Sequence, residues 1–100
     1  MLTRFGKMLR TIRLERDELL RDMAEKLGVT VAYLSAVENG KRKVPDEWIS
    51  KIIALYDLDD YSAERLQRFA YEERNDLRLN LSNVTPGQRE LAYSFARRFQ

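Results

Sequence analysis

The densest group of chemically active side chains in this chain is the basic run Lys41-Arg42-Lys43, which directly follows Asn39-Gly40. Ammonium and guanidinium groups gathered in one turn can neutralise phosphates or carboxylates. The sequence contains no cysteine and no histidine, so disulfides, thiolate metal sites and the commonest general base are excluded. These residue types favour anion binding over catalysis.

Charge is distributed unevenly along the 100 residues, although the formal net charge is only +2. Residues 1–43 carry ten Lys and Arg against six Asp and Glu, whereas residues 44–76 carry four against nine. Residues 77–100 carry four against one. A basic first segment beside an acidic middle segment fits one face turned toward phosphate and another turned away. Ordinary solvated helix faces explain most of these charges equally well, but not the Lys41-Arg42-Lys43 run.

Other motifs that could carry an activity are weak. The acidic cluster Asp57-Leu58-Asp59-Asp60 lacks the glycine and the distant glutamate of a calcium loop, so we expect it to cap a helix. No phosphate-cradling glycine loop appears, and we expect no enzymatic activity, no metal and no cofactor. No apolar run approaches the roughly 20 residues that span a bilayer, and the N-terminal residues lack a signal-peptide h-region. We therefore expect a cytoplasmic protein without a membrane partner.

Apolar residues recur at helical spacing through most of the chain and predict an all-α protein. The first expected helix covers residues 3–16. The second is capped by Asp17 and ends at Leu27, and the third covers 31–38. The fourth is opened by Pro45-Asp46-Glu47, and the fifth covers 62–75. The stripe residues predicted to form the core are Phe5, Met8, Leu9, Ile12, Met23, Ala24, Leu27, Leu34, Val37, Trp48, Ile49, Ile52, Ile53, Tyr56, Leu66, Phe69 and Ala70.

The second and third predicted helices are joined by a short turn with clear stop and start signals. Gly28 stands where a left-handed cap residue would end the first of them, and Thr30 is placed to cap the next. Two helices joined in this way form a helix-turn-helix, which presents its second helix to the major groove of DNA. DNA binding is therefore the leading hypothesis.

The chain resembles the Cro/cI-type repressors, also called the XRE family. The matching residues are Arg13, Met23-Ala24-Glu25, Gly28-Val29-Thr30, Tyr33-Leu34-Ser35, Val37, Glu38-Asn39-Gly40-Lys41 and Pro45. The resemblance implies a lambda-repressor-like five-helix DNA-binding domain over about residues 3–75. We accordingly predict a DNA-binding domain at 1–76 and an extension at 77–100.

The resemblance also implies roles for individual residues. Arg13 and Glu38 match a buried structural ion pair that ties the first helix to the end of the third. Phosphate contacts are expected from the hydroxyl of Thr30, the amide of Asn39, the backbone N–H of Lys41 and the ammonium of Lys43, with Arg42 as an extra contact. Arg21 could supply a phosphate contact in place of the glutamine that many members carry where this chain has Leu20. The residues expected to face the bases are Val31, Ala32, Tyr33, Ser35 and Ala36.

Several of these groove-facing residues depart from the polar side chains frequent in the family. Val31 and Ala32 can touch only thymine methyl groups, whereas Ser35 both donates and accepts hydrogen bonds. We expect specificity to depend on thymine contacts, DNA shape and dimer spacing.

The last quarter of the chain has a different pattern. Leu77, Leu79 and Leu81 alternate with polar residues, which predicts a short strand. The strand would pair with its copy in a second subunit or lie across its own core. A final helix is expected from Thr85-Pro86, with Leu91, Phe95 and Phe99 as an apolar stripe for dimerisation or partner binding.

Together these features predict a homodimeric repressor that binds an inverted-repeat operator in double-stranded DNA. The alternative is an antitoxin or mobile-element regulator whose C-terminal helix binds a toxin or protease partner.

Overall fold

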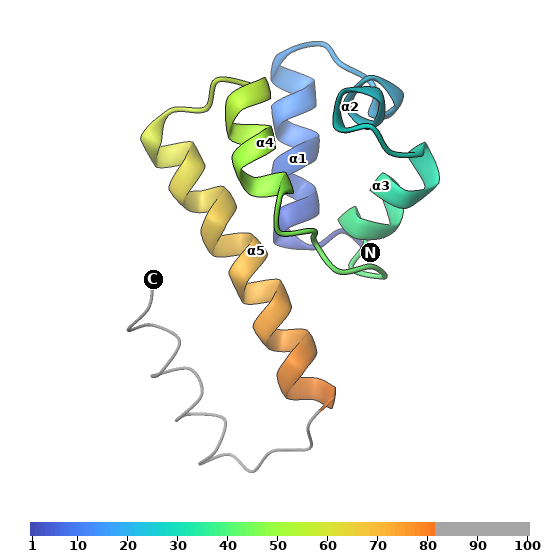
Figure 1. Cartoon of the computed structure of the whole chain (residues 1–100), viewed down its shortest axis with the longest axis vertical. Helices are drawn as coiled ribbons and strands as arrows, with labels where there is room; N and C mark the ends of the chain where they lie inside the picture. The colour runs from blue at the N-terminus through green and yellow to red at the C-terminus, as the bar shows by residue number, and fades with distance from the viewer. Residues whose placement is uncertain (82–100) are drawn as a thin grey trace.

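The computed structural model describes the backbone of residues 1–81 and the side chains of residues 1–74. Five helices make up this part of the chain: α1 (Arg4–Glu15), α2 (Leu20–Leu27), α3 (Val31–Glu38), α4 (Trp48–Leu55) and α5 (Asp60–Leu81). In Figure 1, α1 stands between the α2–α3 hairpin on one side and α4 with α5 on the other. α1 packs on both α3 and α5, and α4 bridges α2 and α5. All the described secondary structure is therefore helical, as the apolar spacing predicts.

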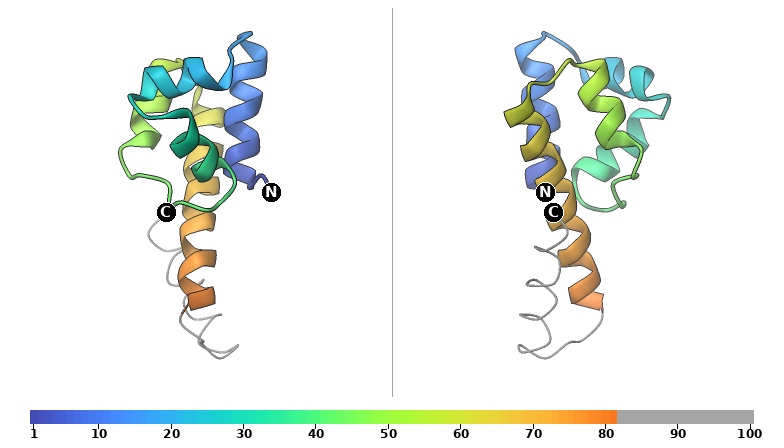
Figure 2. Two further views of the ribbon diagram at one scale, coloured as in Figure 1. Left: turned by 90° about the vertical axis from the view of Figure 1, so that its right-hand side faces the viewer. Right: turned by 60° about the vertical axis from the view of Figure 1, so that its left-hand side comes forward.

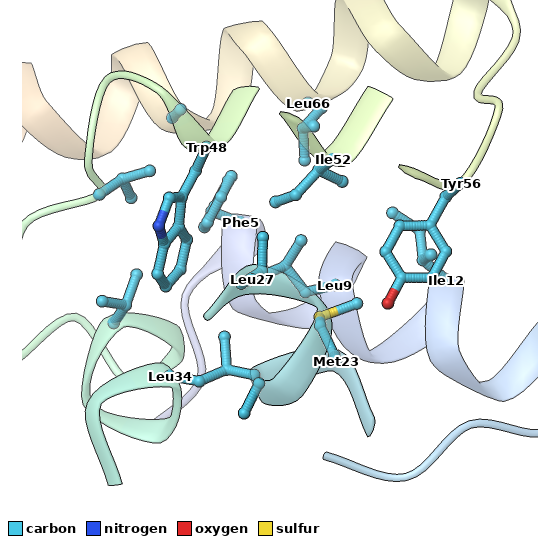
Figure 3. Packing of buried hydrophobic residues seen from close by; sticks show 14 residues of the cluster. Phe5, Leu9, Ile12, Met23, Leu27, Leu34, Trp48, Ile52, Tyr56 and Leu66 are labelled. Atoms are coloured by element: carbon cyan, nitrogen blue, oxygen red, sulfur yellow. The ribbon is translucent and has the colours of Figure 1, made fainter. Parts of the chain in front are cut away.

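The core lies where α1 to α5 meet, and Figure 3 shows side chains from all of them converging there. Met8, Ile49, Ile53 and Phe69 lie at its edge and are partly buried. Every other predicted core residue is buried, and Val44, which the helical stripes did not include, joins them from the loop before α4. The buried apolar cluster consists of Phe5, Leu9, Ile12, Met23, Ala24, Leu27, Leu34, Val37, Val44, Trp48, Ile52, Tyr56, Leu66 and Ala70.

The α2–α3 hairpin has the predicted local signals. Gly28 adopts a left-handed conformation with φ of 73°, and its backbone N–H donates to the carbonyls of Ala24 and Glu25. The Thr30 hydroxyl accepts a 3.0 Å hydrogen bond from the backbone N–H of Tyr33. These bonds satisfy backbone groups at the end of α2 and at the start of α3, and α3 covers the predicted residues 31–38.

The start of α2 differs from the prediction, because Asp17 does not cap it. Asp17 takes a left-handed φ of 54° in the turn that follows α1. The N-cap is Leu19, whose backbone N–H donates to the carboxylate of Asp22 at 2.8 Å. The Asp22 carboxylate, inside the first turn of α2, thus takes the capping role that was expected of Asp17.

The boundaries of the last two helices also shift. Pro45 to Glu47 form a turn, so α4 begins only at Trp48. The acidic cluster does cap α5: the Asp59 carboxylate accepts a 2.7 Å bond from the backbone N–H of Ser62. This hydrogen bond lowers the pKa of Asp59, because it stabilises the charged form.

The predicted strand at 77–81 is wrong, since these residues continue α5 to Leu81. Extending an existing helix adds one hydrogen bond for each residue fixed, whereas a lone strand needs a partner. Leu77 and Leu81 are also four apart, so five alternating residues did not distinguish the two structures. The predicted final helix from Thr85, with Leu91, Phe95 and Phe99, lies outside the described residues.

Candidate nucleic-acid interface

Helix α3 has one buried face and one that is open to a ligand. Leu34 and Val37 are fully buried and fix the inner face on the core. Val31 and Ala32 are exposed, and Ser35 and Ala36 are partly exposed. The open face is therefore short and weakly polar, with one hydroxyl and small or branched apolar groups.

Tyr33 is held more firmly than a freely exposed side chain on this face would be. Its ring is half-buried and meets the ring of Trp48 edge-on, with 5.8 Å between the ring centroids and an angle of 90° between the planes. Such a contact contributes about 0.5–1.5 kcal/mol beyond the area that it buries. Tyr33 thus ties α3 to the first turn of α4, a packing role that its position in the sequence did not reveal.

The basic turn, Asn39–Lys43, follows α3 directly and has a fixed backbone. Gly40 takes a left-handed φ of 74°. The backbone N–H groups of Lys41 and Arg42 both donate to the Ala36 carbonyl, at 2.9 and 3.3 Å. The Lys41 N–H, from which a phosphate contact was expected, is therefore already bonded within the protein.

The three cations of the basic turn remain available. The side chains of Lys41, Arg42 and Lys43 are exposed, and none forms an ion pair with the residues that the structure describes. Charged groups that are not already compensated can neutralise phosphates in a ligand. These three exposed side chains form a concentrated positive group next to α3.

The side chains of the other candidate phosphate ligands, Asn39, Thr30 and Arg21, are restrained to different extents by hydrogen bonds within the protein. The Asn39 amide donates to the Ser35 carbonyl at 2.8 Å, which restrains its orientation. The Thr30 hydroxyl accepts from Tyr33, and its own proton is left to donate elsewhere. Arg21 is exposed at the second residue of α2. Thr30 and the basic turn thus lie at opposite ends of α3, so they bracket its open face.

A buried ion pair fixes α3 relative to α1. The guanidinium of Arg13 donates to both carboxylate oxygens of Glu38, through Nη1 to Oε2 and through Nη2 to Oε1 at 3.1 Å. The two side chains are only 8% and 5% exposed. Arg13 Nη1 also contacts the sulfur of Met23 at 3.2 Å, which brings α2 into the same junction. The ion pair thus sets the orientation of the hairpin against α1.

A second junction at the end of α3 was not predicted from the sequence. The Glu38 carbonyl accepts bonds from the backbone N–H and the hydroxyl of Thr3, at 3.0 and 3.2 Å. A Cβ added to Gly6 would lie 2.1 Å from that same carbonyl oxygen. Glycine inside a helix costs stability and often marks a close approach of another backbone, and Gly6 was the signal that could have located this contact.

One of the comparisons with known proteins agrees with this geometry. A family model described as a helix-turn-helix domain matches residues 4–66, which include all of α1 to α4 and the start of α5. The chain belongs to this helix-turn-helix family. No curated protein and no solved structure matches the chain. Membership of the helix-turn-helix family supports a DNA-binding regulator.

Most candidate residues of this helix-turn-helix follow one another along the chain from Thr30 to Lys43, whereas Arg21 lies on α2. Figure 2 shows α3 and the loop that follows it from two further sides. The leucines at 77, 79 and 81 lie instead at the far end of α5, which extends beyond the other helices. None of the described helices is long and apolar enough to cross a membrane.

Proposed function

We propose that this protein is a sequence-specific DNA-binding transcriptional regulator of the Cro/cI type, with α3 in the major groove. The observation that carries the proposal is the pairing of an open α3 face with three exposed cations immediately after it, none of them ion-paired within the described residues. The buried ion pair between Arg13 and Glu38 holds this helix rigidly, so little ordering is needed on binding. A rigid helix flanked by cations satisfies both needs of a groove reader.

Contacts to bases and to phosphates are divided between two sets of residues. Val31 and Ala32 contact thymine methyl groups, and Ser35 hydrogen-bonds a base edge. The hydroxyl of Thr30, the Asn39 amide and the side chains of Arg21, Lys41, Arg42 and Lys43 contact phosphates. Phosphate contacts set register and salt dependence, whereas the α3 face sets base preference.

The test separates these two roles by their salt dependence. Lys41→Ala should weaken binding almost equally on every duplex and lower the slope of log affinity against log salt by about one. Ala32→Gln should change the preferred base at one position with an unchanged salt slope. Lys7→Ala removes the same charge from an exposed site on α1 and serves as the control. A changed base preference in Lys41→Ala, with the salt slope of the wild type, would contradict the division of roles.

The proposal extends to a homodimeric repressor. Residues 77–81 at the projecting end of α5 would join two subunits, helix against helix, and place two copies of α3 on an inverted repeat. Half-sites about 10 bp apart, centre to centre, suit two-fold helix-turn-helix dimers. Repression follows physically because a dimer seated across an operator excludes other proteins from the same DNA.

The projecting end of α5 also favours a second candidate, a regulator that binds a toxin or protease through its C-terminal region. Sedimentation equilibrium distinguishes the two, because the homodimer should appear with the purified chain alone. A monodisperse monomer at high concentration would contradict the homodimer and favour a different partner for this end of α5.

A further inference from the structure

Helix α5 contacts the loop that leaves the basic turn. Nη2 of Arg74 donates to the backbone carbonyl of Val44 at 3.1 Å. The same nitrogen lies 2.9 Å from a carboxylate oxygen of Asp46. The Arg74 side chain is 27% exposed, so both contacts are made at the edge of the core. One side chain therefore joins α5 to two residues of the 44–46 loop.

This loop is the only covalent connection between the basic turn and α4. On the α3 side, the turn is fixed by the bonds from Lys41 and Arg42 to the Ala36 carbonyl. On the other side, Val44 follows Lys43 directly and its side chain is buried, with 1% exposed. The bond from Arg74 to the Val44 carbonyl restrains the backbone on this side, next to the last cation of the turn.

The two contacts of Arg74 differ in strength. Asp46 is 83% exposed, and an ion pair with so exposed a partner contributes little because water screens it. The bond to the Val44 carbonyl joins a charged donor to a less exposed acceptor, and bonds of this kind are stronger than neutral ones. The backbone contact should therefore carry most of the effect.

We infer that Arg74 is a positioning residue for DNA binding, which holds the 44–46 loop and thereby the three cations of the basic turn. The inference rests on the proposed function, because the cations matter only if they contact phosphate. It also makes α5 part of the DNA-binding apparatus, although α5 lies outside the helix-turn-helix itself. Arg74 acts through the loop and does not itself touch DNA.

The test compares Arg74→Met with Arg65→Met in the full chain on one duplex. Methionine keeps an unbranched stem at both positions. Arg65 lies on the same helix, over the rings of Tyr61 and Phe69, so its loss removes the same charge without touching the loop. At a temperature where both variants are folded, Arg74→Met should bind about tenfold more weakly than Arg65→Met, a loss set by one charged hydrogen bond. Its salt slope should match that of Arg65→Met.

Three outcomes would overturn the inference. Equal affinity of the two variants would show that Arg74 is not needed to hold the 44–46 loop. A salt slope lower by about one in Arg74→Met than in Arg65→Met would make Arg74 a phosphate contact. If Arg74→Met does not fold, Arg74→Lys replaces it, since lysine keeps the charge but its ammonium ends one bond short of the position of Nη2, which makes both contacts. Arg74→Lys should bind more weakly than the wild type at an unchanged salt slope, and wild-type affinity would contradict the inference. Failure of the wild type to bind any duplex would instead refute the proposed function.

Discussion

The ion pair between Arg13 and Glu38 provides the strongest prediction about stability. Replacing Arg13 with methionine leaves the Glu38 carboxylate, only 5% exposed, without its guanidinium partner. Breaking a buried pair from one side costs about 3–5 kcal/mol because the remaining charge is left uncompensated in the core. Small domains have a free energy of unfolding of about 5–15 kcal/mol, so this single change removes a large share of it. Glu38→Leu should have a similar cost, since it strands Arg13 instead.

Urea unfolding of a double-mutant cycle measures this effect. The double variant Arg13→Met with Glu38→Leu removes both charges and should be clearly more stable than either single variant. Arg4→Met is the matched control, because Arg4 pairs with Glu72 on the surface at 3.6 Å and with 75% of its side chain exposed. That exposed pair should be worth about 0–1 kcal/mol. A loss in Arg13→Met no larger than the loss in Arg4→Met would refute the reasoning.

Two further predictions concern glycine and pH. Gly6→Ala should lower the free energy of unfolding by about 3 kcal/mol, because its Cβ would overlap a backbone carbonyl of α3 at 2.1 Å. Gly28→Ala should cost only about 1–2 kcal/mol, since nothing lies near its Cβ and only the left-handed φ of 73° opposes the substitution. A larger loss of stability in Gly28→Ala than in Gly6→Ala, measured by urea unfolding, would contradict this prediction. The Tyr56 hydroxyl donates a 3.2 Å hydrogen bond to the Glu18 carboxylate, and burial together with this carboxylate raises the pKa of Tyr56 to about 12. In the unfolded chain the phenol ionises near pH 10. The contribution of the protonated Tyr56 to the free energy of unfolding is therefore fully present below pH 10 and is lost as the pH rises to about 12. Tyr56→Phe should flatten the decline in stability over that range, whereas Tyr61→Phe, at a 69% exposed site, should not.

The parts of the fold that the sequence predicted correctly depend on local hydrogen bonds and on helical spacing. Gly28 and Thr30 sit on either side of the turn before α3, and their own backbone and hydroxyl groups end one helix and begin the next. The apolar stripes of α1 and α4 likewise identify their buried faces, because the period of a helix fixes which residues share a side. Such signals are contained in stretches of a few residues.

The parts that could not be predicted depend on contacts between residues far apart in the chain. The Thr3 hydroxyl reaches the Glu38 carbonyl across 35 positions, and Arg74 reaches the Val44 carbonyl across 30. No local pattern indicates which carbonyl a distant donor will meet. The extension of α5 to Leu81 was missed for a different reason, since five alternating residues fit both a strand and the continuation of a helix.

Selection of bound sites from random duplex DNA, at about 150 mM salt, tests the central claim most directly. The purified chain should enrich an inverted repeat with fixed spacing and thymine at the positions that α3 touches. Retention that weakens with salt, without any enriched motif, would contradict sequence-specific binding by this chain alone. No retention at any salt concentration would contradict DNA binding itself.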